Sequence, residues 1–504
     1  MSEASPAESL SPMRRLAILI TLTSCVALYA MTVTIANVAL PDIQGSLSAT
    51  QDQIALIVTF NIVATAVATP MTGWLTGQLG QRRVMIWCVC GFTVSSLLCG
   101  LATGLPELVF FRVLQGLTGA PLVPLSQAIS LASYPQRQHG TVTSVFGIGV
   151  MLGPIVAPVI GGWLSEEYGW RFVFYMLVPF GLAALLGVLA VVQDLARPPK
   201  VRLDWTGFLA LSVAIASFQL LVDRGERNDW FDSVEIMLEA ALAMLALWVF
   251  VVHTATGRAP FLSVALFRDR NFVLGMLIVF IFGMTNFTPM VLMPPLLQNL
   301  RGYPDDLVGV LLAVRGLGTL LAFILMIWGS RLDPRIWLVT GFSLQGLAGW
   351  WMAQFSIDLT TLDVALATTL QGFGVGLLWV PITLVTFSTL NPRLLPEGSS
   401  VFHLLRNLGS SLHISLSVAL VIRAGKINYA QIAEQITPFR ESLFYAQITG
   451  GWRIDSVEGL KSLSGEIARQ ATMIGYIDSF YFFALTAWGV LPVVFLVRYR
   501  RNEG

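Results

Sequence analysis

Three arginines stand inside long apolar stretches of this sequence: Arg112, Arg315 and Arg406. Burying a charged side chain in hydrocarbon costs at least about 2.5 kcal/mol, so each of them should face a cavity or a polar partner. Gln115 follows Arg112 by one helical turn and shares its helix face. Two interpretations stay open. In the structural interpretation, Arg112 ties helices together through carbonyl oxygens, and Arg315 and Arg406 pair with helix C-termini or lipid phosphate. In the functional interpretation, Arg315 and Arg406 line a cavity that suits an anionic or acidic substrate.

A second kind of chemistry, proton transfer across a membrane, requires a group that binds a proton on one side and releases it on the other. Buried carboxylic acids usually do this. No Asp or Glu falls inside the first six apolar runs of the chain. The candidates are Asp223, Glu239 and Asp478, which stand at or near the ends of later runs.

Asp478 and His413 each have a structural and a functional interpretation. Asp478 opens the last apolar run and is expected to lie at its outer mouth, close to Arg423 or Lys426, where a surface ion pair is the alternative. Histidine is the side chain whose charge changes near neutral pH. A single histidine in an apolar run can also be a hydrogen-bonded core residue.

Several neutral polar residues also stand in apolar runs. Such side chains more often join helices by hydrogen bonds than contact a ligand. They are Asn37, Asn286, Asn407, Gln219 and Gln345.

The composition predicts the elements that must hold these residues. Of 504 residues, 55% are hydrophobic and 12% charged, and the mean hydropathy is +0.73. Apolar runs of about 20 residues suffice to cross a bilayer as helices. We therefore predict an all-α protein with fourteen transmembrane helices, at about 16–38, 53–76, 84–101, 108–131, 141–163, 171–192, 205–222, 236–254, 272–296, 306–328, 335–354, 362–388, 400–422 and 477–497.

The distribution of basic residues predicts the orientation of these helices. Seventeen Arg and Lys residues fall on one side and four in the short loops of the other, so the positive-inside rule places both termini in the cytoplasm. The first apolar run is too long for a cleaved signal peptide and is expected to be a retained helix. The seventeen are Arg14, Arg15, Arg82, Arg83, Arg137, Arg197, Lys200, Arg202, Arg258, Arg268, Arg270, Arg331, Arg335, Arg393, Arg498, Arg500 and Arg501, and the four are Arg171, Arg224, Arg227 and Arg301.

Weak internal repetition predicts two similar halves. Leu114-Gln115-Gly116 recurs as Leu370-Gln371-Gly372, and Gly73 recurs as Gly329, both at an offset of 256 residues. Two similar halves around a central site are typical of transporters. The resulting domains are a tail at 1–15, a six-helix bundle at 16–192, two accessory helices at 193–258, a second bundle at 259–498 with a long outer loop at about 423–476, and a tail at 499–504.

Other function classes find little support in the residues. The four cysteines lie in apolar runs, which argues against disulfides and a zinc site, and we expect no metal and no cofactor. The net charge of +1 gives no reason to expect a nucleic-acid partner, and no GxxxxGK[ST] loop for a nucleotide is present. Four histidines on separate elements do not suggest a membrane enzyme.

Two glycine-rich motifs have a physical interpretation of their own. Gly73 and Gly80, followed by Arg82 and Arg83, are expected to form a tight turn with arginines on the inner face. A second cluster lies on the predicted helix at 141–163, where small residues allow close helix contact and prolines kink the helix. Its members are Gly153, Pro154, Pro158, Gly161 and Gly162.

With these motifs the sequence resembles the major facilitator superfamily, in its fourteen-helix drug:proton antiporter branch, and most of all the EmrB-type exporters. The resemblance extends from about Arg14 to Tyr499, and the order and spacing of its pieces make it specific. These pieces include TIANVALP (34–41), TGWLTGQLGQRR (72–83), FRVLQGLTGAPLVPLSQ (111–127), GPIVAPVIGGW (153–163), LLQNLRGY (296–303), VRGLG (314–318) and LLRNLG (404–409).

The resemblance implies an inner-membrane exporter of small amphipathic compounds such as drugs and weak acids, working by alternating access in exchange for protons. It implies a periplasmic adaptor and an outer-membrane channel as partners, with the 423–476 segment as a candidate docking surface, for which a decoration without a docking role is the alternative. It also implies that Arg112 relays between proton and substrate, and that the span at 141–163 blocks leak. The accessory helices are expected outside the transport path, which weakens Asp223 and Glu239 as candidates.

Two departures from the family pattern concern acidic residues. The family's usual first-helix aspartate, five residues before Asn37, is replaced by Thr32, which cannot carry a proton. The aspartate usual in the inner loop is replaced by Gly77. Coupling through Asp478 or His413, a substrate that carries its own proton or charge, and an uncoupled facilitator all remain possible mechanisms. An uptake carrier and a non-transporting sensor or scaffold are the alternative functions.

Overall fold

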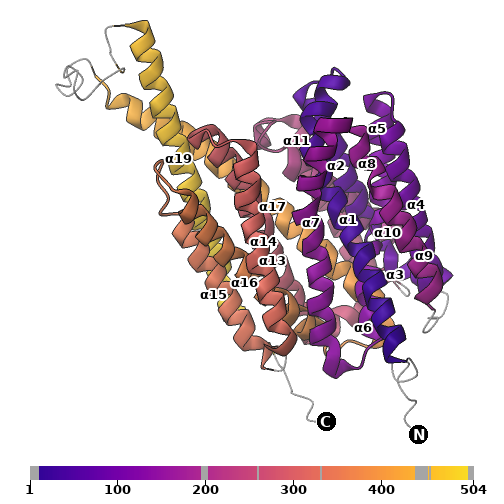
Figure 1. Ribbon diagram of the computed structural model, residues 1–504. Helices are drawn as coiled ribbons and strands as arrows, with labels where there is room; N and C mark the ends of the chain where they lie inside the picture. Colours follow the sequence, from indigo (N-terminus) through magenta and orange to yellow (C-terminus); the bar gives the residue numbers. More distant parts are fainter. Residues whose placement is uncertain are drawn as a thin grey trace.

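The computed structural model describes residues 11–193, 202–257, 260–329, 332–437, 452 and 456–497, and within these ranges the chain is helical without strands. Figure 1 shows two groups of helices side by side, an early group containing α1 to α9 and a late group containing α13 to α16, with the paired helices α17 and α19 extending beyond one end. The described part of the chain therefore confirms the all-α prediction. We call the end at which α1 begins the inner end, and the opposite end the outer end.

The early group comprises nine helices. Some of the predicted spans in it consist of two consecutive helices. Pro70 separates α2 from α3, and the two axes differ by 55°. Pro121 likewise separates α5 from α6. The bounds are α1 Pro12–Ser46, α2 Gln51–Ala68, α3 Met71–Leu79, α4 Gln81–Leu101, α5 Leu105–Gly119, α6 Leu122–Ala132, α7 His139–Tyr168, α8 Arg171–Tyr175 and α9 Leu177–Val191.

The later part of the chain contains the accessory pair and the second group. Asp204, Asp269 and Thr360 each accept backbone hydrogen bonds at a helix N-terminus, which explains where α10, α13 and α16 begin. The bounds are α10 Trp205–Arg224, α11 Val234–Thr256, α12 Val264–Arg268, α13 Arg270–Pro295, α14 Asp305–Gly329, α15 Pro334–Met352, α16 Thr361–Phe387, α17 Leu395–Glu434, α19 Val457–Gly489 and α20 Leu491–Val494.

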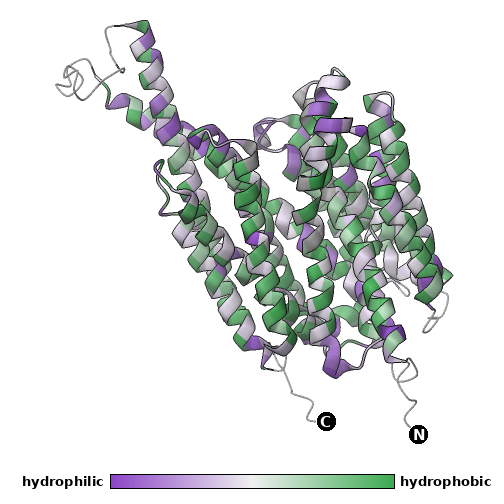
Figure 2. Ribbon diagram, viewed as in Figure 1, coloured by the Kyte–Doolittle hydropathy of each residue, from purple (hydrophilic) through white to green (hydrophobic). Residues whose placement is uncertain are grey.

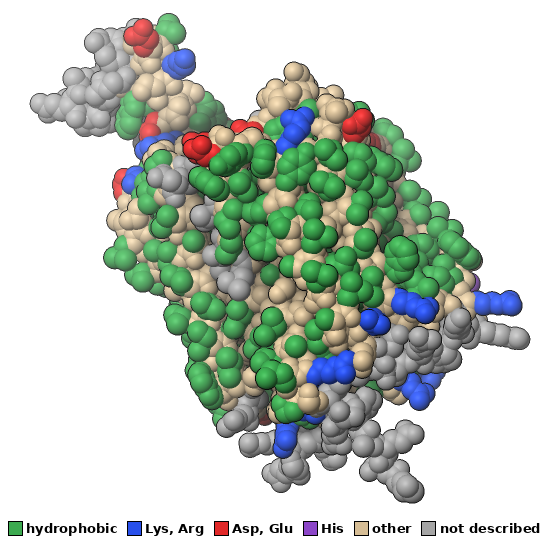
Figure 3. Space-filling view, turned by 45° about the vertical axis from the view of Figure 1, so that its right-hand side comes forward, with side chains coloured by type: hydrophobic (Ala, Val, Ile, Leu, Met, Phe, Trp, Pro, Cys, Tyr) green, Lys and Arg blue, Asp and Glu red, His purple; other side chains and the backbone are tan. Residues whose placement is uncertain are grey.

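Apolar residues cover the sides of the bundle, and hydrophilic residues gather at its two ends and on the arm formed by α17 and α19 (Figure 2). On the face shown in Figure 3, the charged side chains near the inner end are mainly Lys and Arg. Eleven helices of the described chain are long and apolar enough to cross a membrane, or twelve if the bent α2–α3 pair counts as one span. The chain is therefore a multi-pass membrane protein.

Each of the fourteen predicted spans coincides with a helix or a helix pair. Two of them are not among the eleven or twelve: 141–163 within α7, part of whose side chains lie outside the described residues, and 335–354 at α15, which is less apolar. The count of fourteen and the placement of the termini stay predictions, because residues 1–10 and 498–504 lie outside the described residues, as do Arg197, Lys200, Arg258 and Arg331.

The predicted outer loop at 423–476 is largely an extension of two helices. α17 continues to Glu434, and α19 begins at Val457, well before the predicted span at 477. The two helices pack against each other, and Tyr429 and Ser464 share a hydrogen bond of 2.9 Å in this arm. Residues 438–451 and 453–455 lie outside the described residues.

Candidate functional site

Arg112 is buried inside the early group with an exposed fraction of 1%. Its Nη1 donates a 2.6 Å hydrogen bond to Gln115 Oε1, as the one-turn spacing predicts. Its Nε donates to the Ile57 carbonyl of α2 at 3.4 Å, and Gln115 Nε2 continues the network to Ser96 Oγ at 2.7 Å. The contacts with Ile57 and Ser96 join α5 to α2 and to α4 within one half, so Arg112 has a clear structural role.

Arg315 on α14 forms the corresponding network in the late group. Its Nε donates to Gln371 Oε1 at 2.5 Å, and its Nη2 donates to both the carbonyl and Oδ1 of Asn286, at 2.7 and 3.0 Å. Gln371 Nε2 donates in turn to Gln345 Oε1 at 3.2 Å. Charge-assisted bonds of this kind compensate for burial of the guanidinium group.

The two networks occupy equivalent places in the two halves. Thr65 Oγ1 of α2 donates to the Gly116 carbonyl at 3.4 Å, and Thr319 Oγ1 of α14 donates to the Gly372 carbonyl at 2.9 Å. The residue before each of these glycines is a glutamine, Gln115 or Gln371, and its Oε1 accepts a hydrogen bond from a buried arginine. The sequence repeat therefore corresponds to a repeated hydrogen-bond pattern.

Arg406 on α17 differs from these two arginines. It is half-buried, and its Nε and Nη2 donate to Oδ1 of the adjacent Asn407, at 3.3 and 3.0 Å. The guanidinium carbon lies 5.4 Å from the centre of the Trp379 ring, a cation–π arrangement. The guanidinium group of Arg406 is thus the least engaged of the three.

Thr32 and Asn37 lie on α1 as predicted. The Thr32 side chain is buried, and its Oγ1 donates to the Leu28 carbonyl one turn earlier at 3.2 Å. The hydroxyl therefore finds its hydrogen-bond acceptor within its own helix. The side chain of Asn37 lies outside the described residues.

His413 is fully buried, and its contacts come from the late group. Its Nδ1 shares hydrogen bonds with Thr288 Oγ1 at 2.8 Å and Ser417 Oγ at 3.2 Å. Its ring stacks on Phe482 with centroids 4.7 Å apart. These contacts join α13, α17 and α19, as expected of a hydrogen-bonded core histidine.

Asp478 is half-buried on α19. Within the described residues, neither Arg423 nor Lys426 forms an ion pair with it, and Arg423 Nε lies 4.0 Å from Glu226 Oε2 instead. The carboxyl group of Asp478 consequently has no described charged partner.

The accessory helices contact both groups. Thr59 of α2 donates a short hydrogen bond to Asp223 of α10, and Gln219 Nε2 donates to Ser411 Oγ of α17 at 2.7 Å. Glu239 Oε1 of α11 lies 3.7 Å from Arg224 Nη1. The polar residues of this pair thus serve helix-to-helix contacts.

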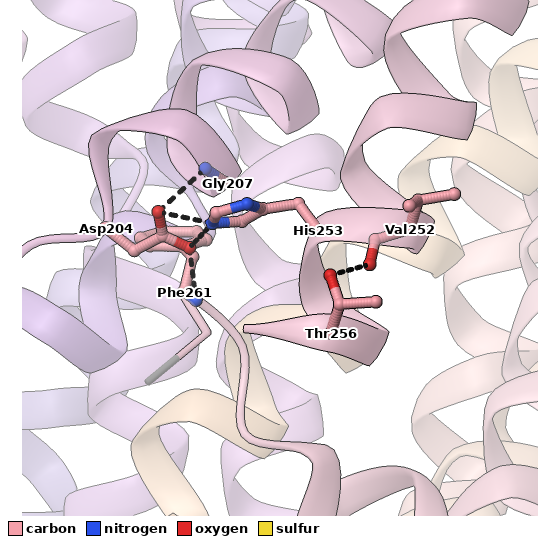
Figure 4. Close-up of polar contacts among 6 residues, drawn as sticks. All are labelled: Asp204, Gly207, Val252, His253, Thr256 and Phe261. Atoms are coloured by element: carbon pink, nitrogen blue, oxygen red, sulfur yellow. Dashed lines mark hydrogen bonds and ion pairs between the residues drawn. The ribbon is translucent and has the colours of Figure 1, made fainter. Parts of the chain in front are cut away.

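At the inner end of the accessory pair, one carboxylate joins three segments (Figure 4). Asp204 accepts from the Gly207 N–H at 3.0 Å, from His253 Nε2 at 2.8 Å and from the Phe261 N–H at 3.1 Å. Burial raises the pKa of the Asp204 carboxyl, but these hydrogen bonds outweigh burial and hold it below its usual value. The carboxylate connects α10, α11 and the chain leading to α12.

The inner-loop motif lies where the two groups meet. Gly80 has φ of +87°, a conformation suited to glycine, and ends α3. A Cβ on Gly73 would lie 2.9 Å from the Glu397 Cβ at the start of α17, so this glycine allows close contact between α3 and α17. Arg82 donates to the Leu189 carbonyl at 2.9 Å, and Arg83 is exposed.

The second glycine motif brings α7 against α1. A Cβ on Gly153 would lie 2.8 Å from the Ala27 carbonyl oxygen and from the Met31 nitrogen, and one on Gly161 would lie 2.6 Å from Ile35 Cγ1. Gly162 lies on the same helix, and the side chains of Pro154 and Pro158 lie outside the described residues. Close packing is therefore the role that the geometry supports.

Sequence reasoning did not select Trp379, Gln127, Ser399 or His403 as site residues. All four are buried at 3% exposure or less, close to the plane between the two groups. Gln127 of α6 accepts hydrogen bonds from Ser399 and His403 of α17, across more than 270 residues of sequence. No local pattern signals such a pairing.

Comparison with known proteins agrees with the multi-pass helical arrangement. Residues 22–413 match the profile of a family described as the Major Facilitator Superfamily. The chain is 32% identical to the multidrug export protein EmrB of Escherichia coli (strain K12) over 451 residues, which cover 88% of this chain and 87% of that protein. It is 29% identical to the fatty acid resistance protein FarB of Neisseria gonorrhoeae over 468 residues, which cover 92% of each protein.

Solved structures share the fold at low sequence identity. The proton:xylose symporter XylE aligns with a TM-score of 0.61 at 12% identity, over 96% of this chain and 97% of that one. The human organic anion transporter MFSD10 aligns with a TM-score of 0.58 at 13% identity, over 95% of this chain and all of that one.

Proposed function

The chain belongs to the major facilitator superfamily, and we propose that it exports small amphipathic compounds, including drugs and weak acids. The family is one of transporters, so the chain is a transporter and not an enzyme. Export, rather than uptake, is proposed because several relatives are named as multidrug export proteins. The substrate would move by alternating access between the two groups of helices.

The observation that carries the substrate proposal is the half-buried Arg406 above the Trp379 ring. Arg112 and Arg315 are each held by a glutamine and by backbone oxygens, whereas Arg406 is held by its neighbour Asn407. An arginine whose planar face lies on an aromatic ring keeps N–H donors at its edge that can pair with an acidic group. This combination suits an amphipathic weak acid.

Exchange for protons is the proposed driving force, with Asp478 as the leading proton carrier. Thr32 has no carboxyl group and cannot carry a proton. The hydrogen bonds of His413 to Thr288 and Ser417 favour a structural role for that histidine. Asp478 is half-buried without a described ion pair, which leaves it available for a proton. A substrate that carries its own proton or charge is the alternative.

The proposed location is the inner membrane of a bacterium, with a periplasmic adaptor and an outer-membrane channel as partners. The outer parts of α17 and α19 support this proposal because they form a paired-helix arm with hydrophilic residues on it (Figures 1 and 2). Ile427 and Leu460 on this arm are exposed large apolar residues that a partner could cover.

The test uses everted membrane vesicles energised with a proton gradient, to which weak acids and cationic compounds are added in turn. Substrate-dependent proton release that is lost in Asp478→Asn and kept in His413→Ala would support the proposal. Substrate movement without a proton signal would overturn proton exchange and favour an uncoupled facilitator. Absence of movement for every compound, with the protein correctly inserted, would favour a sensor or scaffold.

A further inference from the structure

A buried hydrogen-bonded cluster joins the two groups of helices at the inner end. Gln127 Oε1 of α6 accepts from Ser399 Oγ at 2.8 Å and from His403 Nε2 at 2.8 Å, both on α17. All three side chains are 2% exposed. The contact is therefore a direct polar link between the halves, sealed from solvent.

The chemistry of this cluster is asymmetric. Ser399 and His403 are one helical turn apart, so both point from the same face of α17 toward one acceptor. A glutamine Oε1 can only accept, so His403 donates from a protonated Nε2. Within the described chain, Gln127 Nε2 and His403 Nδ1 have no protein partner. Two hydrogen bonds thus hold the cluster together, while Gln127 Nε2 and His403 Nδ1 form no hydrogen bond within the described chain.

The cluster lies directly inward of Arg406. His403 precedes Arg406 by three residues on α17, and its ring centroid lies 5.9 Å from that of Trp379. Trp379 and Phe323 in turn lie against Gly147 of α7, where an added Cβ would come within 3.1 and 2.5 Å of them. Polar and apolar contacts between the halves therefore close the inner end below the proposed anion site.

We propose that Gln127, Ser399 and His403 form the latch of the inner gate, whose hydrogen bonds exist when the inner end is closed and break when it opens. This inference rests on the alternating access proposed above. The three residues are positioning residues: they set the balance between closed and open inner ends and need not touch the substrate.

The partial pairing of the cluster suits a reversible latch. Opening breaks the two bonds to Gln127 Oε1 but allows water to reach all the polar atoms, including the two that lack partners when buried. The free-energy difference between the two states then stays small, as a gate that must open in every cycle requires. A fully apolar contact would lack the directional bonds that fix one closed arrangement.

Cross-linking at a nearby site measures the gate without depending on transport. Gln136 Nε2 donates to the Ser388 carbonyl at 3.2 Å, across the same inner end and outside the latch. A protein carrying both Gln136→Cys and Ser388→Cys, treated in membrane vesicles with a short thiol cross-linker, reports the closed state through the extent of cross-linking. The native cysteines lie within helices, and a chain without the introduced pair measures their background.

Gln127→Leu removes the acceptor while keeping the side-chain volume, and we expect the cross-linking rate to fall about tenfold. His403→Phe should act in the same direction, whereas His403→Gln supplies an N–H at similar reach and should restore most of the wild-type rate. Ser130→Ala, a buried residue on the same helix as Gln127, is the matched control and should leave the rate unchanged.

Equal cross-linking in Gln127→Leu and the wild type, with both proteins folded by size-exclusion chromatography, would overturn the latch. So would a His403→Gln variant as impaired as His403→Phe. Should Gln127→Leu fail to fold, Ser399→Ala removes one of the two bonds, and we expect about a threefold fall. These readings are made with no substrate, so a failure to find any transported compound would count against the proposed function and not against the latch.

Discussion

Gln115 and Gln371 occupy equivalent positions in the two halves, and Oε1 of each accepts a hydrogen bond from a buried arginine, at 2.6 and 2.5 Å. The arginines come from different helices. Arg112 lies on the same helix as Gln115, whereas Arg315 lies on α14 and reaches across to Gln371 on α16. The two halves thus share the glutamine acceptor, but the buried arginine that donates to it lies on a different helix in each half.

This relationship predicts different consequences for the two glutamines. Gln115→Leu leaves Arg112 with the 3.4 Å contact to the Ile57 carbonyl, while Gln371→Leu leaves Arg315 with both oxygens of Asn286. Leaving a buried charge-bearing group underpaired costs about 1–3 kcal/mol or more. We expect Gln115→Leu to lower the thermal unfolding temperature in detergent more than Gln371→Leu does. The opposite order would contradict the roles assigned to these bonds.

Gly153 is predicted to tolerate no side chain. An alanine there would place its Cβ 2.8 Å from backbone atoms of α1, which cannot move aside as a flexible side chain can. We expect Gly153→Ala to reduce the yield of folded protein or lower its unfolding temperature by the equivalent of about 1–3 kcal/mol. Gly465→Ala on α19 is the control, because no atom lies within 4 Å of its added Cβ, and alanine favours helix there. Equal behaviour of the two variants would argue against close packing of α7 on α1.

Thr32 is predicted to be dispensable for proton movement. Its hydroxyl donates to the Leu28 carbonyl of its own helix, so Thr32→Val removes a bond that contributes about 1 kcal/mol and changes the volume little. Proton release measured in energised vesicles should match that of the wild type. A variant that is folded and moves substrate but no longer releases protons would show that this hydroxyl belongs to the proton path.

Asp204 gives a pH dependence of stability that can be measured. Its pKa is held below the ordinary value of 3.8, because hydrogen bonds from Gly207, His253 and Phe261 outweigh the effect of burial. A depressed pKa in the folded state stabilises the protein at pH values above 3.8 and loses that contribution as the pH falls through the lower folded pKa. Asp204→Ala should therefore be less stable than the wild type by about 1–2 kcal/mol at neutral pH.

The difference between Asp204→Ala and the wild type should shrink below pH 3.8 in thermal unfolding measured across a pH series. Asp358→Ala, which removes an exposed carboxylate, serves as the control and should show no comparable difference. A gap between Asp204→Ala and the wild type that stays constant to strongly acidic pH would mean that the carboxylate charge is not what stabilises the fold.

Local patterns in the sequence predicted the helices well, because hydropathy and length decide them. The one-turn spacing placed Arg112 and Gln115 on one helix face, and in the structure the two side chains form a hydrogen bond. Of the two inner-loop glycines expected to form a turn, Gly80 does so with a positive φ, whereas Gly73 lies within α3. Such features depend on residues that are near one another in the chain.

Local sequence patterns could not predict contacts between residues that lie far apart in the chain. The bond between Gln127 and His403 spans 276 residues, and both partners look like ordinary members of apolar helices. The sequence also does not show that the Arg406 guanidinium group is free to pair with a substrate. Whether an arginine is held by a glutamine on another helix depends on how the helices pack. The break in the span at α2 and α3 illustrates a smaller miss, where Pro70 bends the path by 55°.

Arg406 is proposed to recognise an acidic group on an exported compound, and we would test this by measuring transport kinetics of Arg406→Gln in everted, energised vesicles. A hydrogen bond to a charged group contributes about 1.5–3 kcal/mol, so the KM for a weak acid should rise at least about tenfold. The KM for a cationic compound should not rise, and Arg406→Lys should fall between the two. An unchanged KM for every transported weak acid in the folded Arg406→Gln protein would contradict the claim.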